Sequence, residues 1–514
     1  MNMTMKSFRQ FLMSAAVLLT AFASAYAYND GLPRSTPEAE GVDPQVISQF
    51  FSDLDKSGLE VHSIMIIRHG KVIAEHWWAP YAPEYTHAMY SCTKTITATA
   101  IGFAVQEGLL KVSDKVISFF PDLLPDVISD DLANLTVEHL LSMSVGHKSM
   151  SYAGSGLPQV KSFLAAEFEY HPGTHFAYNI SASHMLSNII SRVTGMSIKE
   201  YLEPRLFEPL GIKDIVWEMD DDGHNMGNGG SHLRTSDMAK FGIFLMNKGK
   251  YNGRQLLNSE WIESATRPHI YQKDPDGPEK DAKDDGGQGY GYQCWMGRNG
   301  SYRAIGAMNQ VILVFPDKDF AVISNGAVRD ETAFNDLCYA MLPGVGDKKL
   351  KASRTDFASQ LEGYALKKPF ELSEPLVKSE TRKYRMYQNQ YGIEKVCFRF
   401  DAKGNCQVTL ETATSNTNLD FGISDWMLRQ TDRKMAFARS TYPNTQDVTP
   451  YYSAGLCTWT GKDQLTCQSL SFFNAGATEN FRFTFDGDNL KMELVGAAPS
   501  STVVLEGVNS KQNL

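Results

Sequence analysis

Two strand-turn-strand patterns, separated by a long helical stretch, restrict the fold of this chain more than any other feature. The first covers residues 62–78 and turns at Gly70, and the second covers residues 311–324 and turns at Pro316. Both consist of short apolar, β-prone runs of the kind that form hairpins. Hairpins at the two ends of a region with a helical middle indicate one antiparallel sheet built from both ends and covered by helices. The sequence therefore predicts an α+β fold with a largely helical insertion.

The helical middle is best defined over residues 93–110. Its apolar residues recur mostly at three- and four-residue steps, which is the period of a buried helix, and Ser91 lies at its start. The same reasoning predicts further helices over residues 137–143, 183–193, 198–203, 236–247 and 331–341.

The pattern changes after Pro343. Residues 346–375 contain several lysines and have weak periodicity, so we interpret them as a linker. Over residues 376–514, short alternating runs are separated by Gly, Asn and Asp turns, which is typical of an all-β module, either a sandwich or a barrel. We expect this C-terminal β-rich domain to follow a first domain that spans residues 28–345.

Residues 1–27 have the pattern of a secretory signal peptide. Lys6 and Arg9 precede an apolar run over residues 11–22, and small residues follow up to Ala27. This run is shorter than the roughly 20 apolar residues that a membrane span needs, and no later stretch qualifies. We therefore expect a mature protein that is periplasmic or secreted and has no stable membrane span after signal cleavage.

The charge balance limits the partners of the chain. The formal net charge is -10 at pH 7, and the isoelectric point is about 5.7. Proteins that bind nucleic acids need clustered Lys and Arg to neutralise phosphates. We therefore expect no nucleic acid as a partner, whereas a small-molecule substrate remains open.

The residues Ser91 and Lys94 form the pattern Ser-x-x-Lys at the predicted start of a buried helix. Residues three apart lie on one face of a helix, so the amine can reach the hydroxyl. Serine is a weak nucleophile on its own, and a partly desolvated lysine can take its proton. Tyr178 lies on a loop before another predicted helix, where its phenol can relay protons to a leaving group.

Several sequence blocks around these residues resemble the penicillin-recognising serine hydrolase superfamily. This superfamily includes class C β-lactamases, serine esterases and 6-aminohexanoate-dimer hydrolases, and the last branch is the most similar. The order and spacing of the blocks fit over residues 36–343. The blocks are Met89-Tyr90-Ser91-Cys92-Thr93-Lys94, residues 135–144, Pro172-Gly173-Thr174 with Tyr178, and Asn228-Gly229-Gly230 before residues 237–242.

The resemblance implies a Ser-Lys-Tyr site made by Ser91, Lys94 and Tyr178, between a β-lactamase-like sheet layer and a helical subdomain. It also implies a pocket-lining strand with a basic residue, a small residue and a glycine. The best match is Ala304-Ile305-Gly306-Ala307, which makes Gly306 and Ala304 candidate substrate-binding residues. The backbone N–H groups of Ser91 and Ala307 are the implied oxyanion hole.

The chain departs from the family pattern at two positions. Ala304 stands where relatives carry Lys or His, and the neighbouring Arg303 should point to the other face of the strand, as a surface charge. Ile180 stands where relatives often carry Asn, so Asn179 is the remaining amide near Lys94. These changes weaken the prediction of β-lactam carboxylate recognition.

Other chemistries find less support in the sequence. His171 and His175 flank a Pro-Gly turn without a third ligand at a recognisable spacing, so we expect no metal and no cofactor. We interpret residues 274–287 as an exposed loop. If export allows disulfides, local bonds between Cys397 and Cys406 and between Cys457 and Cys467 are preferred.

The sequence thus predicts an exported serine hydrolase that acts through an acyl-enzyme on a small-molecule ester, amide or peptide substrate. Three alternatives stay open. The protein could be a D,D-peptidase, a β-lactamase, or a catalytically weakened penicillin-binding-type protein that binds cell-wall fragments.

Overall fold

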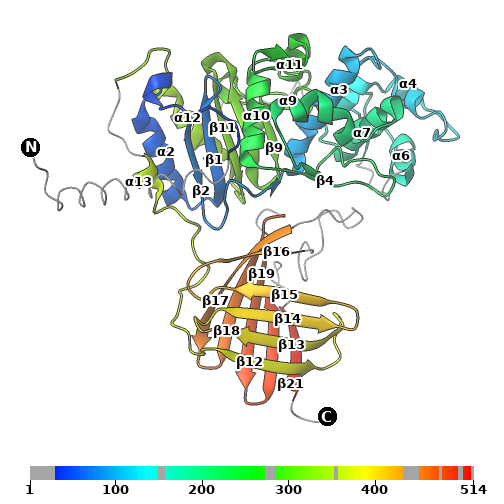
Figure 1. The fold of residues 1–514 in the computed structure, drawn as a ribbon. Coiled ribbons are helices and arrows are strands. Elements are labelled where there is room, and N and C mark those ends of the chain that lie inside the picture. The colour runs from blue at the N-terminus through cyan, green and yellow to red at the C-terminus, as the bar shows by residue number, and fades with distance from the viewer. Residues whose placement is uncertain are drawn as a thin grey trace, which may run out of the picture.

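The computed structural model describes residues 29–148, 157–272, 284–351, 357–431, 451–473, 477–495 and 502–510. The predicted signal peptide, residues 1–27, lies outside them. Figure 1 shows an α+β domain above and an all-β domain below, as the sequence predicts. Within the described residues, no helix combines the length and the apolar character needed to cross a membrane.

The α+β domain is organised around an antiparallel six-stranded sheet with the order β2-β1-β11-β10-β9-β8. Strand β1 pairs with β2 in the first predicted hairpin and with β11 in the second, so both ends of the domain meet in one sheet. The strands are β1 (Val61–Arg68), β2 (Lys71–Trp77), β8 (Trp295–Met296), β9 (Tyr302–Gly306), β10 (Gln310–Phe315) and β11 (Phe320–Gly326).

One face of this sheet is covered by α2 (Pro44–Ser57) and α12 (Glu331–Ala340). Helix α2 begins because Asp43 caps it by accepting the N–H of Gln45, and it ends at Gly58, whose φ of 73° suits only glycine well. The apolar side chains of both helices share one buried cluster with alternate residues of the strands.

The opposite face is covered by α10 (Thr235–Met246), behind which lie α3 (Thr93–Gln106) and α7 (Ile180–Thr194). Gly242 of α10 lies so close to the sheet that a Cβ there would be 2.9 Å from Ile312. The expected helix over residues 93–110 ends early, at Gln106. Helix α7 starts before the expected residue 183 because Asn179 caps it by accepting the N–H of Ala182.

The remaining elements of this domain are short. They are η1 (Glu38–Glu40), β3 (His87–Ala88), η2 (Tyr90–Cys92), η3 (Val116–Phe119), α4 (Asp130–Asn134), α5 (Val137–Leu141), α6 (Leu157–Leu164), α8 (Ile198–Leu202), η4 (Glu203–Phe207), α9 (Glu208–Leu210), β4 (Val216–Trp217), β5 (Ser231–Leu233), β6 (Lys250–Tyr251), β7 (Arg254–Gln255), α11 (Ser259–Ala265), η5 (Asp285–Gly287), η6 (Arg298–Gly300), η7 (Ala307–Asn309), η8 (Pro316–Lys318) and η9 (Leu342–Gly344).

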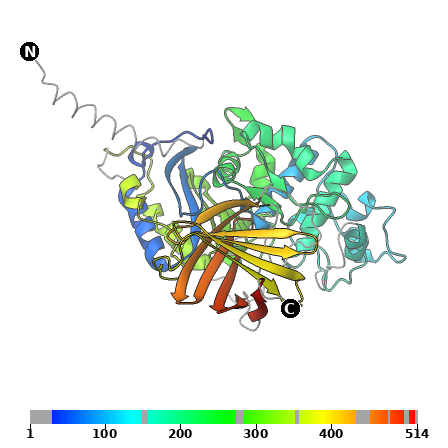
Figure 2. The same ribbon diagram turned by 60° about the horizontal axis from the view of Figure 1, so that its bottom comes forward.

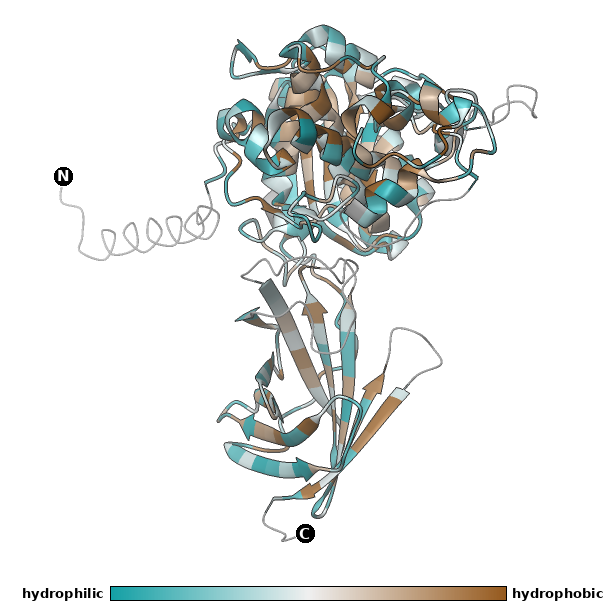
Figure 3. Ribbon diagram, turned by 90° about the vertical axis from the view of Figure 1, so that its right-hand side faces the viewer, coloured by the Kyte–Doolittle hydropathy of each residue, from teal (hydrophilic) through white to brown (hydrophobic). Residues whose placement is uncertain are grey.

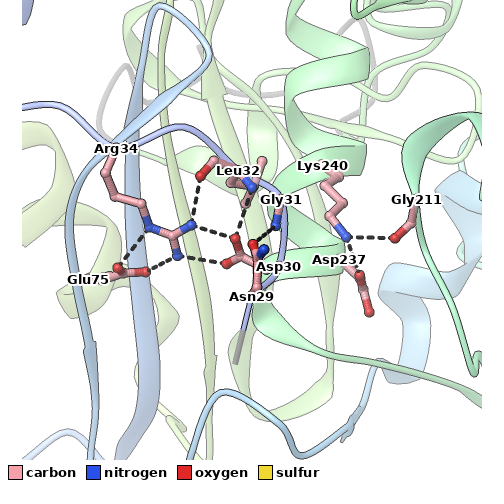
Figure 4. A network of polar contacts seen from close by, with 9 residues as sticks. All are labelled: Asn29, Asp30, Gly31, Leu32, Arg34, Glu75, Gly211, Asp237 and Lys240. Carbon is pink, nitrogen blue, oxygen red and sulfur yellow. Dashed lines mark hydrogen bonds and ion pairs between the residues drawn. The ribbon is translucent and has the colours of Figure 1, made fainter. Parts of the chain in front are cut away.

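Polar contacts fix the first described residues to the domain (Figure 4). The guanidinium of Arg34 donates to the carboxylates of Asp30 and of Glu75 on β2. In the same view, Lys240 of α10 bonds Asp237 and the carbonyl oxygen of Gly211. These bonds tie the N-terminal segment to the sheet and α10 to the loop before β4.

The C-terminal domain is a ten-stranded antiparallel sheet whose first strand, β12, pairs with its last, β21. It curls into a barrel, where Gly422 bridges to Leu456 across the remaining gap. Figure 3 shows hydrophobic and hydrophilic residues alternating along its strands, and the inward side chains form one apolar cluster. The strands are β12 (Glu380–Met386), β13 (Ile393–Phe400), β14 (Cys406–Thr412), β15 (Asn416–Phe421), β16 (Met427–Thr431), β17 (Tyr451–Gly461), β18 (Gln464–Ser471), β19 (Thr478–Asp486), β20 (Asn489–Val495) and β21 (Thr502–Asn509).

The preferred disulfides in this domain are not formed, because all seven cysteines are free and buried. Cys397 lies opposite Thr409, whereas Cys406 lies opposite Phe400, so the register separates the first pair along the hairpin. Cys457 and Cys467 lie directly opposite each other, yet both remain thiols.

Figure 2 shows the molecule turned so that the barrel comes forward, in front of the α+β domain. The two domains contact each other through aromatic rings. Phe472 stacks on Tyr81 with ring centroids 4.6 Å apart, and Phe473 stacks on His232 at 3.9 Å. Between the domains, α13 (Phe357–Leu361) is held to α2 by hydrogen bonds between Gln360 and Ser48. Lys368 of the same segment donates to the carbonyl oxygen of Ser424 in the barrel, so the described parts of residues 346–375 contact both domains. The proposed linker boundaries stay a prediction.

Candidate active site

Ser91 lies in a tight turn between the short strand β3 and helix α3. The N–H of Met89 donates to the carbonyl oxygen of Ser231 on β5, which fixes the start of the turn. The next residue, Tyr90, has a φ of 44°, a left-handed conformation that side chains rarely adopt. Strain of this kind persists only where surrounding contacts enforce it, and it presents the half-buried Ser91 just before the start of α3.

Lys94 lies one helical turn after Ser91 and is 2% exposed. Its Nζ is 2.8 Å from Oγ of Ser91 and donates to the carbonyl oxygen of Asn228 at 2.6 Å. Burial lowers the pKa of Lys94 to about 7, because the ammonium loses hydration and has no carboxylate beside it among the described residues. A neutral amine is therefore available near neutral pH, in contact with the hydroxyl.

The loop that supplies the Asn228 carbonyl is held from behind by a buried histidine. His184 of α7 bonds the carboxylate of Asp220 through Nε2 at 3.0 Å, and its Nδ1 accepts the N–H of Gly227. Thr97 of α3 donates to the carbonyl oxygen of Gly227. The backbone at residues 227–228 is thus fixed on both sides, which sets the position of the Lys94 partner.

Tyr178 lies on the same cavity wall as Ser91, just before helix α7. Its ring stacks on Trp295 with centroids 5.8 Å apart, and Nζ of Lys94 lies 5.1 Å from the centre of the ring. The structure therefore brings Ser91, Lys94 and Tyr178 together, as the sequence predicts. Asn179, the amide expected near Lys94, instead uses its side-chain oxygen to cap α7.

A cavity of about 490 Å³ opens beside Ser91. Ser91, Tyr178, Gly306 and Ala307 all line it. The end of β9 touches the nucleophile turn, because a Cβ on Gly306 would lie 2.2 Å from the carbonyl oxygen of Met89 and 3.0 Å from the nitrogen of Ser91. Only glycine permits this approach, which brings the backbone of Ala307 alongside that of Ser91.

One expectation for β9, the surface position of Arg303, is wrong, and the substrate-binding role of Ala304 stays a prediction. Ala304 is not among the residues that line the cavity, and its methyl group is buried in the core opposite Ile312. Arg303 was expected to be a surface charge, but it is 4% exposed and lines the cavity with Ile305. The physical reason is that the cavity continues around the edge of the sheet onto the face that carries α12.

The segment expected as an exposed loop, residues 274–287, is folded at its end. Residues 284–287 include η5, where buried Asp285 accepts hydrogen bonds from Arg298, Asn335 and Tyr339. Residues 274–283 lie outside the described residues. In the part of the chain that the structure describes, no group of three or more His, Cys, Asp or Glu residues could hold a metal ion.

The family model described as beta-lactamase matches residues 47–336, more than half of the chain. The chain belongs to the beta-lactamase family. Members of this family include serine hydrolases and peptidases, which is the broad class of chemistry that the match supports for this beta-lactamase-family protein.

Curated relatives of this beta-lactamase-family protein include hydrolases and peptidases. It is similar to the 6-aminohexanoate-dimer hydrolase of Paenarthrobacter ureafaciens, with 22% identity over 51% of this chain and 71% of that protein. It is also similar to a putative D-alanyl-D-alanine carboxypeptidase of Salmonella agona, with 25% identity over 40% of this chain. The chain spans only 56% of that carboxypeptidase.

Among solved structures, a putative 6-aminohexanoate-dimer hydrolase from Bacillus anthracis matches 61% of this chain and 86% of its own. Its TM-score is 0.49 and its identity 19%. An octameric penicillin-binding protein homologue from Pyrococcus abyssi matches 90% of this chain and 99% of its own, with a TM-score of 0.45 and 19% identity.

Sequence reasoning missed three contributors to the site. The Asn228 carbonyl carries no signature because it is a backbone group. Trp295, the stacking partner of Tyr178, lies on a two-residue strand that is too short to show a pattern. Glu331 lines the cavity from the start of α12. Acidic residues are common at the N-termini of helices, where they stabilise the helix dipole, so this one gave no sign of a site.

Proposed function

We propose that this protein is a serine hydrolase in which Ser91 is the nucleophile, Lys94 its general base and Tyr178 a proton relay. The observation that carries the proposal is the position of the buried Lys94 amine, 2.8 Å from Oγ of Ser91. The pKa of Lys94, lowered to about 7 by burial, supplies the neutral form that a base requires.

In the proposed reaction, Nζ of Lys94 accepts the hydroxyl proton while Oγ of Ser91 forms a bond to the substrate carbonyl carbon. The N–H groups of Ser91 and Ala307 bind the resulting oxyanion. The carbon–oxygen or carbon–nitrogen bond to the leaving group then breaks, and the proton on Lys94 passes to the leaving group through Tyr178. Water hydrolyses the acyl-enzyme by the same steps and restores Ser91.

The proposed substrates are small esters, amides or short peptides. The similarity to a 6-aminohexanoate-dimer hydrolase and to a putative carboxypeptidase supports this range, and a cavity of about 490 Å³ suits a molecule of that size. The catalytic groups need no metal or cofactor for this chemistry.

A serine-directed fluorophosphonate probe tests the nucleophile. We expect the protein to be labelled at Ser91, and Ser91→Ala to abolish labelling because it removes the hydroxyl that lies 2.8 Å from the Lys94 amine. Labelling is read by peptide mass spectrometry. Equal labelling of the Ser91→Ala variant would disprove the assignment, and unlabelled native protein with a folded spectrum would favour a binding protein without catalysis.

We also propose export, with cleavage after Ala27 and a periplasmic or secreted product. The signal-peptide pattern of residues 1–27 supports this proposal. Expression of the full chain in a Gram-negative host should give a mature N-terminus at Tyr28, read by N-terminal peptide mass spectrometry. An intact N-terminus on protein that remains in the cytoplasm would exclude it.

A further inference from the structure

Arg303 on β9 is a buried cation inside the Ser91 cavity. Its side chain lines the cavity, the residue is 4% exposed, and Nη1 donates to the carbonyl oxygen of Met296 at 3.0 Å. Among the described residues, Nε has no hydrogen-bond partner, and Asp285 and Glu331 feel the guanidinium as a nearby charge without a hydrogen bond to it. A buried arginine normally has such a partner, because removing its charge from water is costly.

Two carboxylates that line the same cavity, Asp285 and Glu331, do not take that role. Asp285 is engaged by Arg298 and by the hydroxyl of Tyr339, which donates at 2.7 Å. Glu331 lines the same cavity, and among the described residues no hydrogen bond or ion pair joins it to Arg303. Burial raises the pKa of Glu331, and the nearby charge of Arg303 acts in the opposite direction.

The position of Arg303 relative to Ser91 determines how far a bound carboxylate lies from the reacting serine. Gly306, three residues later on the same strand, touches the nucleophile turn. A strand rises about 3.3 Å per residue, which places the backbone of Arg303 roughly 10 Å from the reacting serine. Because the cavity is continuous from Ser91 to Arg303, one extended substrate can occupy both places.

We propose that Arg303 binds a carboxylate of the substrate that lies several atoms from the scissile carbonyl, so that the enzyme selects anionic esters or amides. This inference rests on the proposed function. A guanidinium suits a carboxylate because its planar N–H groups form charge-assisted hydrogen bonds with it. The substrate would thereby supply the counter-ion that the described residues do not provide.

Two series of chromogenic esters test this selectivity and show on which side of the scissile bond the carboxylate lies. The acyl series consists of the 4-nitrophenyl monoesters of adipate, pimelate and suberate, each compared with its ω-amide of equal length. The leaving-group series consists of acetyl esters of hydroxyphenyl alkanoates and their amides. The measured quantity is the ratio of kcat/KM for the carboxylate to that for the matched amide.

The native enzyme should favour the carboxylate in one of the two series, and Arg303→Gln should lower that ratio about ten- to a hundredfold, as expected for one charge-assisted hydrogen bond. Glu331→Gln should raise the ratio, because it removes a competing negative charge. Arg192→Gln, which changes an arginine on α7 that pairs with Asp122, should leave it unchanged. A ratio that Arg303→Gln leaves unchanged in both series would overturn the proposal.

Two further measurements distinguish failure of the Arg303 proposal from misfolding of the variant and from a lack of esterase activity. If Arg303→Gln does not fold, Arg303→Lys replaces it, and loss of the two-point geometry should still lower the ratio. If the native protein hydrolyses no ester, calorimetric binding of adipate monoamide to the Ser91→Ala variant tests the anion site alone. Binding that vanishes in Ser91→Ala/Arg303→Gln then supports the site without the proposed catalysis, and no binding to Ser91→Ala overturns both.

Discussion

The side chain of Lys94 is held by two contacts that orient its amine. The carbonyl oxygen of Asn228 can only accept, so one N–H of the amine must point toward it. In the neutral form, this leaves the lone pair free to face Oγ of Ser91, 2.8 Å away. Burial therefore favours the neutral amine, and the contact with Asn228 orients its lone pair toward Ser91.

The first prediction concerns the pH dependence of this amine. Because the pKa of Lys94 is lowered to about 7, the base is protonated and inactive below that pH. We expect kcat/KM for a neutral aryl ester to fall with acidification, by roughly tenfold per pH unit well below the pKa, and to level off above it. Initial rates in a constant-ionic-strength buffer series check this.

Two substitutions at the same position control this prediction. Lys94→Ala should lower kcat/KM by about 10²–10⁴-fold, as expected for a lost general base. Lys94→Arg keeps a cation but cannot release a proton at accessible pH, so its loss should be similar. A fully active Lys94→Arg enzyme would show that the charge matters and that the base lies elsewhere.

Among individual residues, the sequence predicted those that act through their side chains and lie at a fixed local spacing. Ser91 and Lys94 are three apart on a helix, so their proximity is a local property. Arg303 was expected at the surface because strand alternation predicts only the face on which a side chain lies. It does not predict that a cavity extends around the sheet edge to that face. Asn228 acts through its backbone, which no residue type encodes.

Strand β9 and the turn η2 meet through bare backbone at Gly306. Its φ of -122° is open to any residue, so glycine is required here by the close approach to Met89 and not by conformation. The contact links the strand that ends just before the proposed oxyanion donor Ala307 to the turn that carries Ser91. The geometry between the two N–H groups therefore depends on this one missing side chain.

The second prediction is that Gly306→Ala separates these two elements. A Cβ 2.2 Å from a carbonyl oxygen cannot be accommodated without backbone movement. We expect a loss of about 1–3 kcal/mol in the free energy of unfolding, typical of overpacking, together with slower fluorophosphonate labelling. Chemical denaturation and labelling rates measure the two effects.

Gly363→Ala provides the matched control for Gly306→Ala. An added Cβ at Gly363 meets no atom within 4 Å, so its effect on stability should stay within about 0.5 kcal/mol. Normal labelling of a Gly306→Ala enzyme would mean that the strand and the turn adjust independently.

Most elements of the first domain were predictable because their signals are local. The two hairpins have apolar runs with clear turns, and α10 and α12 begin within a residue of the expected positions. Helix boundaries set by capping, as at Asn179, were less predictable. The state of the hairpin cysteines was also less predictable. Disulfide pairing depends on strand register, and a register that places Cys397 opposite Thr409 cannot be read from spacing alone.

The two domains are joined by a contact as well as by the chain. Phe472 and Phe473, at the end of β18, stack on Tyr81 and His232. His232 lies on β5, one residue after Ser231, whose carbonyl fixes the nucleophile turn. The barrel therefore rests against the scaffold of the active site.

The third prediction is that these rings hold the barrel in place. Lys348, Lys349 and Lys351 are exposed in the segment between the domains, and we expect trypsin to cleave there and release a folded barrel. Because the rings resist separation, Phe472→Ala/Phe473→Ala should release the barrel faster after cleavage. Gel filtration of the cleaved protein measures release.

A surface double variant, Lys491→Ala/Glu493→Ala, serves as the control, because both residues lie on β20 and pair with each other. If the cleaved native protein and both variants release the barrel equally fast, the aromatic contact does not contribute to docking. If none is cleaved, the barrel is an inseparable part of the catalytic domain.

The existence of the barrel could be predicted from its alternating strands, but its docking site could not. Phe472 and Phe473 follow a strand with the same apolar character as the barrel interior, so the sequence does not distinguish a contact residue from a core residue. Their partners lie hundreds of positions earlier, and only the folded chain brings them together.

The pairing of first and last strands in each domain also determines the order in which the protein can be completed during synthesis. Strand β1 cannot pair with β11 until β11 has been synthesised, and β12 likewise cannot pair with β21 until β21 has been synthesised. A nascent chain exposes the free edge of β1 until residue 326 has left the ribosome, and such edges are sites of aggregation. A message truncated before residue 502 would leave β12 and β20 both unpaired on one side, while the catalytic domain is already whole.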